Sequence, residues 1–136
     1  MVDNKSIVDF DETKIIHENL FSIPIVKYQT TNTEEMNKEL KEIILKKEKE
    51  TPTTTKSNQG GWQSEGDFFR WGGQSIEKLH NLFLQLIESS TKKLEFVETI
   101  PMDFHIYGWA NVNRKGHSNI AHIHPMSTWS GTYYVD

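Results

Sequence analysis

The hydrophobic pattern of this chain changes from a helical repeat to an alternation of period two after residue 95. This change constrains the fold more than any other feature. The stretches 33–49 and 75–93 repeat their apolar residues at helical spacing, whereas 104–113 alternates apolar and polar residues. Alternation of that kind is typical of a strand with one buried face. Helices followed by strands predict an α+β fold with a sheet core.

Each helical stretch has recognisable boundaries. The first predicted helix, Thr33–Lys49, has Asn32 or Thr33 as its cap and carries an apolar stripe of Met36, Leu40, Ile43 and Ile44. The second predicted helix, Ser75–Lys93, begins at a capping Ser75, and its buried side consists of Ile76, Leu79, Phe83, Leu86 and Ile87. Both helices are amphipathic, so each is expected to pack on the sheet with one face.

Three further short segments have the composition of strands. Leu20–Tyr28 is rich in apolar and branched residues, and its proline indicates an edge position, because proline has no N–H to donate. After the turn residues of Arg114–Asn119, the segments Ile120–His124 and Trp129–Val135 are predicted as two more strands.

Length and composition exclude several classes of protein. The 136 residues fit a single domain, 1–136, in which 1–95 holds an N-terminal strand and two helices and 96–136 holds the strands. The net charge of −4 gives no basic excess for nucleic acid, and the absence of cysteine excludes disulfides and thiolate metal sites. The apolar stretch Phe21–Val26 is too short to cross a membrane. We therefore expect a soluble protein of a reducing compartment, the cytoplasm.

Residues able to carry chemistry gather in 61–136, which holds all four tryptophans and five of the six histidines. His122 and His124 stand two apart on a predicted strand, so both side chains would project from one face about 6.5–7 Å apart. Two imidazoles in that arrangement suit a divalent metal ion. The alternative is a pair of exposed or hydrogen-bonded histidines near a turn.

Longer blocks of sequence resemble a known family. Trp109–Gly116, Asn119–Pro125 and Ser130–Val135 are similar to segments of the 2-oxoglutarate- and Fe(II)-dependent oxygenases, as are Leu20–Val26 and Gly60–Ser64. This resemblance implies helices packed on a double-stranded β-helix, a cupin-like jelly roll, that binds Fe(II) and uses 2-oxoglutarate as co-substrate. It also implies hydroxylation of a C–H bond in a substrate that the sequence does not identify.

The same resemblance implies roles for individual residues. His122 matches the first metal-binding histidine of the family, and His124 stands where the family usually has a carboxylate. Asn111 and Asn113 occupy the strand on which related enzymes place an oxoacid-contacting polar group, or else they satisfy backbone groups beside a turn. The family's distal histidine and its oxoacid-gripping Arg or Lys belong to later strands, so we expect the jelly roll to be incomplete.

Two alternatives to an oxygenase follow from these departures. One is an inactive truncated or split product that needs a partner, either a second copy or a complementing C-terminal fragment, at the open sheet edge formed by Tyr133–Val135. The other is a cupin-type metal-binding module, since Gly116 precedes His122 and His124 at the cupin spacing, although the cupin glutamate is missing.

Overall fold

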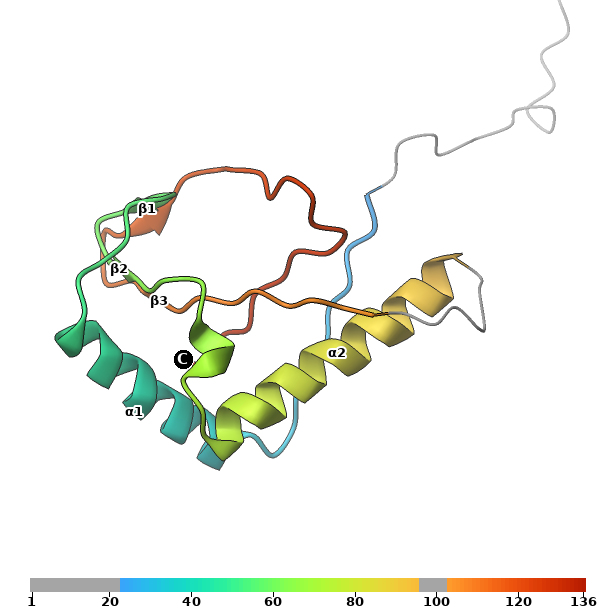
Figure 1. Ribbon diagram of the computed structural model, residues 1–136, viewed down its shortest axis with the longest axis horizontal. Coiled ribbons are helices and arrows are strands. Elements are labelled where there is room, and N and C mark those ends of the chain that lie inside the picture. Colours follow the sequence, from blue (N-terminus) through green and yellow to red (C-terminus); the bar gives the residue numbers. More distant parts are fainter. Residues whose placement is uncertain (1–22, 96–102) are drawn as a thin grey trace, which may run out of the picture.

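The fold combines two long helices with a narrow β-ribbon. A computed structural model describes residues 23–95 and 103–136. Within them, α1 (Glu34–Glu50) and α2 (Gln74–Glu95) are separated by the short 3₁₀ helix η2 (Phe68–Arg70). The two helices diverge from neighbouring N-terminal ends, and η2 lies between them (Figure 1). The α+β class predicted from the sequence is thus confirmed.

Both predicted helices are present, with small differences at their starts. Thr33 occupies the N-cap position of α1, without a hydrogen bond from its side chain to the helix. The prediction that Ser75 caps α2 is wrong, because α2 begins at Gln74. The buried Ser75 hydroxyl instead donates a hydrogen bond to Glu39 of α1. A residue that resembles a cap therefore joins the two helices.

The core lies where the helices meet the ribbon. Its fully or nearly buried apolar residues come from both helices, from η2 and from the ribbon: Leu40, Trp62, Phe68, Ile76, Leu79 and Ala110. The predicted stripe of α1 and the first part of the predicted side of α2 face this core, with Met36, Ile43, Ile44 and Phe83 packed around it. Leu86 and Ile87, predicted as buried, are half-buried and lie outside it, so the helical periodicity identified the buried face of α1 and of the first half of α2.

The ribbon consists of two short antiparallel ladders. β1 (Asn58–Gln59) pairs with β4 (Ser118–Asn119), and β2 (Trp62–Gln63) pairs with β3 (Asn111–Val112). Backbone hydrogen bonds from Ser64 to Ala110, at 3.0 Å, and from Ile120 to Ser57, at 2.8 Å, extend the pairing at both ends. We call residues 57–64 and 110–120 the ribbon.

The alternation predicted for 104–113 is confirmed by burial. Phe104, Ile106, Ala110 and Val112 are half-buried or buried, whereas the histidine, aromatic and asparagine residues between them are exposed. Regular pairing is limited to β3, with an isolated bridge between Gly108 and Asp67. The segment therefore has a strand's two faces while making few ladder hydrogen bonds.

Three predicted strands are not formed in the described residues. Residues 23–28, 120–124 and 129–135 contain no strand, and the beginning of the first prediction, 20–22, lies outside the described residues. Ile23 and Ile25 are 86% and 79% exposed. Branched apolar residues favour a strand only where a neighbouring strand can pair with them and cover one face. None of the described helices has the length and apolar character needed to cross a membrane.

Candidate metal centre

A tight turn leads from β3 to the segment that carries His122 and His124. This turn, Arg114–His117, rests on Gly60 and Gly61, which both have φ of +68°. A Cβ added to Gly60 would lie 2.7 Å from Cδ2 of His117, so only glycine permits this approach. The His117 Nδ1 also accepts a hydrogen bond from the Arg114 N–H at 3.2 Å. The His117 ring therefore has a structural position in the ribbon.

An ion pair attaches the same turn to α1. The Arg114 guanidinium binds both carboxylate oxygens of Glu48, at 2.5 and 2.8 Å. The hydrogen bond from Arg114 lowers the pKa of the Glu48 carboxyl, against a smaller opposing effect of burial. Two parallel hydrogen bonds fix direction as well as distance, so the turn is oriented relative to the helix.

The two asparagines predicted to contact an oxoacid lie in different surroundings. Asn113 Nδ2 donates to Asn119 Oδ1 at 2.9 Å, and Asn119 Nδ2 donates to the Ser57 hydroxyl at 3.1 Å. The amide of Asn113 thus closes the turn. Asn111 is paired with Gln63 in the β2–β3 ladder and exposes its side chain. Its amide faces the same side of the strand as Trp109.

His122 and His124 lie side by side although no strand holds them. Their ring centroids are 4.7 Å apart and the ring planes are inclined by 70°. His122 is exposed and His124 is half-buried. The ring of His124 lies 5.5 Å from that of Trp109, at 31°. The indole of Trp109 therefore covers one side of the pair and connects it to the outer face of 103–113.

A backbone contact orients the first of these imidazoles. His122 Nδ1 lies 2.8 Å from the carbonyl oxygen of Ile120. In the tautomer with its proton on Nδ1, the ring donates to this carbonyl and leaves the Nε2 lone pair available. Metal-bound histidines commonly have such a hydrogen bond from the second nitrogen. The surroundings of His122 therefore fit a metal ligand.

The pair has no third protein ligand among the described residues. Within 23–95 and 103–136, no group of three or more His, Cys, Asp or Glu side chains is placed to hold a metal ion. Non-haem iron oxygenases use two histidines and one carboxylate on one face of the metal. Among the described residues, no carboxylate lies beside His122 and His124 to complete such a set.

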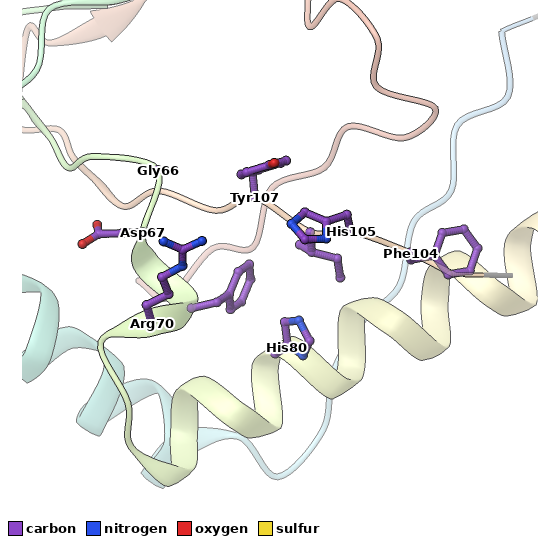
Figure 2. Close-up of a pocket in the computed structure, with 9 residues that line it drawn as sticks. Gly66, Asp67, Arg70, His80, Phe104, His105 and Tyr107 are labelled. Atoms are coloured by element: carbon purple, nitrogen blue, oxygen red, sulfur yellow. The ribbon is translucent and has the colours of Figure 1, made fainter.

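A second cluster of polar side chains was not found from the sequence. A hollow of about 220 Å³ lies between η2, α2 and residues 104–107, and Arg70, His80 and His105 are among the residues that line it. Figure 2 shows Arg70 and His80 facing His105 and Tyr107 across this hollow. Because these residues are far apart in the sequence and have no fixed spacing, no motif could have identified them.

Comparison with known proteins gives one match. The family described as "Putative 2OG-Fe(II) oxygenase" matches residues 107–136, which is less than a quarter of the chain. The matched part contains the turn, the two histidines and both predicted asparagines, and none of the helices. The search of curated proteins found no match. The search of solved structures also found none.

Proposed function

We propose that this chain is a 2-oxoglutarate- and Fe(II)-dependent oxygenase, or part of one, with His122 and His124 as iron ligands. The observation that carries the proposal is the 4.7 Å separation of the two imidazole rings within the segment that matches the oxygenase family. The two histidines are two residues apart in the sequence, and their rings lie next to each other in the structure.

The geometry of the pair supports iron binding by two imidazoles. The hydrogen-bonding position of His122 Nδ1 leaves Nε2 as the ligating atom, and the Trp109 indole covers His124 on one side. When bound, iron would supply the oxidising chemistry, using 2-oxoglutarate and O2. The chain's own part is to hold the metal with open positions and to keep water from the face that Trp109 covers.

Asn111 and Asn113 complete the proposal as oxoacid contacts. Asn111 exposes its amide on the face that also carries Trp109, so it is the better placed of the two to donate a hydrogen bond to a bound carboxylate. Asn113 already donates to Asn119, and a contact with the oxoacid would have to exchange that bond. The family's jelly roll is also part of the proposal, with the ribbon as a portion of its sheet.

Metal titration tests the proposal directly. Co(II) added to the protein should give the absorption of a histidine-bound ion, and 2-oxoglutarate should alter this spectrum. The signal should weaken as the pH falls through the range in which histidine protonates, because imidazolium cannot coordinate a metal. We expect weak binding, since two imidazoles leave most of the coordination sphere to water.

Paired variants assign the binding to these residues. The double variant His122→Ala, His124→Ala should lose the Co(II) signal, whereas Ile123→Ala, which alters only the exposed residue between them, should retain it. Equal affinity in the double variant and the parent would refute the ligand assignment. A Co(II) spectrum that 2-oxoglutarate leaves unchanged would favour the cupin-type module over the oxygenase.

A further inference from the structure

The hollow between η2, α2 and residues 104–107 brings together one arginine, two histidines and aromatic rings that the proposed iron chemistry does not use. Arg70 comes from η2, His80 from α2, and His105 and Tyr107 from the outer face of 103–113. Phe69 contributes an aromatic wall, with its ring 5.0 Å from that of His80 in an edge-to-face arrangement. His105 and Tyr107 pack together at 5.1 Å.

Arg70 and Asp67 bring opposite charges to the hollow, and no ion pair joins them to each other. Among the described residues, Asp67 is the one carboxylate that lines the hollow, and its side chain is directed away from His80 and His105 (Figure 2). The Oδ1 of Asp67 accepts a hydrogen bond from the Trp71 indole at 3.0 Å. No ion pair joins Arg70 to another described residue. The guanidinium of Arg70 therefore has no anionic partner in the described part of the chain.

We propose that this hollow binds a small carboxylic acid with a flat apolar part. A guanidinium recognises a carboxylate through two parallel hydrogen bonds, and the imidazoles of His80 and His105 can donate further ones. The rings of Phe69 and Tyr107 would cover the apolar part of the ligand. The volume of about 220 Å³ lies below the range of about 300–1,000 Å³ that is common for drug-sized ligands, so the ligand is small.

The hollow lies near the histidine pair, but binding in the hollow does not depend on that pair. Tyr107 and Trp109 are on the same face of the extended segment 103–113, and Trp109 contacts His124. A ligand in the hollow would thus lie along the face that leads to the proposed iron site. The binding itself requires only Arg70 and the surrounding rings, and it is measured in metal-free protein.

Benzoate is the probe, and binding is followed by NMR titration. We expect a dissociation constant of about 1 mM, because the hollow is open and one cation dominates it. Benzyl alcohol has the ring without the charge, and acetate has the charge without a ring. Each should bind at least about tenfold more weakly than benzoate. Equal binding of benzyl alcohol and benzoate would overturn the carboxylate requirement.

Variants then locate the site. Arg70→Ala should weaken benzoate binding about tenfold, and Arg70→Lys should restore part of it, since lysine retains the charge without the paired donors. Lys115→Ala, an exposed cation in the Arg114–His117 turn, is the matched control and should bind as the parent does. The same weakening in Lys115→Ala and Arg70→Ala would show that general charge attracts benzoate and would refute the site.

A last variant separates this proposal from the oxygenase proposal. The double variant His122→Ala, His124→Ala should bind benzoate with unchanged affinity, because neither residue lines the hollow. Loss of benzoate binding in that variant would contradict the hollow as the binding site. If the double variant retained both benzoate binding and Co(II) binding, the assignment of His122 and His124 as metal ligands would be refuted, and the proposal for the hollow would stand.

Discussion

The part of the molecule that contains the core and the part that contains the candidate metal ligands are held together by different interactions. The helical region, residues 33–95 with 103–120, contains all the buried apolar residues among those described. The carboxyl-terminal segment, residues 121–136, contains exposed or half-buried residues and no strand. Tyr133 and Val135 of this segment pack against the edge of the core. Polar side chains provide its other attachments to the helices: Trp129 to Thr91 at 2.9 Å, Tyr133 to Asn37 at 2.6 Å, and Asp136 to Lys41.

This difference separates stability from chemistry. Apolar burial contributes roughly 25 cal/mol per Å², so the free energy of folding comes mainly from the helical region. The histidine pair lies on a segment that is attached by the half-buried Tyr133 and Val135 and by exposed or partly exposed polar contacts, each of which contributes little. Substitutions in the two regions should therefore have distinguishable effects, on unfolding in one and on ligand binding in the other.

The largest expected effect is in the core. Leu40→Ala should lower the free energy of unfolding by about 2–5 kcal/mol, because Leu40 is fully buried and its removal leaves a cavity between α1 and the ribbon. Urea denaturation followed by circular dichroism measures this. Ile123→Ala is the matched control, at a side chain that is 83% exposed, and should change stability by less than about 0.5 kcal/mol. Similar losses in both variants would contradict the division into two regions.

A smaller effect is expected where 103–113 meets η2. A Cβ added to Gly108 would lie 2.5 Å from the Phe69 ring, so Gly108→Ala must displace that ring at a cost of about 1–3 kcal/mol. Gly131→Ala, which adds a methyl group with no atom within 4 Å, is the control in the carboxyl-terminal segment. Thermal unfolding of the two variants compares them. An unchanged midpoint for Gly108→Ala would show that Phe69 does not pack on Gly108.

The ion pair between α1 and the turn should contribute less to the free energy of unfolding than the contact of Gly108 with Phe69. Glu48→Gln should reduce stability by about 0.2–1 kcal/mol at neutral pH. Arg114 lowers the pKa of Glu48, so this contribution is present above the unfolded pKa of glutamate, about 4.3, and is lost as the pH falls through the lower folded pKa. The difference between parent and variant should accordingly shrink on acidification below about pH 4.

Denaturation at a series of pH values measures this difference. Glu50→Gln is the control, since Glu50 is exposed and its lysine partner on the same helix, Lys46, is 3.9 Å away. It should have a smaller effect than Glu48→Gln at neutral pH. If the difference in free energy of unfolding between parent and Glu48→Gln increased in acid, the assignment of this ion pair would be contradicted.

The smallest effect on stability is expected at the candidate metal ligands. His122→Ala should change the free energy of unfolding of the metal-free protein by less than about 0.5 kcal/mol, because the side chain is exposed and lies outside the core. Calorimetry of parent and variant measures it. A loss above about 1 kcal/mol would mean that the His122 side chain itself contributes to the stability of the folded protein.

Features that depend on local periodicity could be predicted from the amino-acid sequence. The stripe on α1, the first part of the stripe on α2, the α+β class and the two-faced character of 104–113 follow from the spacing of apolar residues, and the structure confirms them. The family resemblance also identified the segment around His122 that matches an oxygenase family. These conclusions required no knowledge of which segments lie side by side.

The strand pairing, the contacts of Ser75 and the hollow could not be predicted in this way, because they join residues that are distant in sequence. Residues 23–28 and 129–135 have the composition of strands, yet whether they form strands depends on a partner strand that composition does not specify. Ser75 has the residue type of a helix cap, but its hydroxyl contacts Glu39, which is 36 positions away in the sequence. The hollow likewise exists because η2, α2 and 104–107 meet in space, a consequence of packing that no local pattern records.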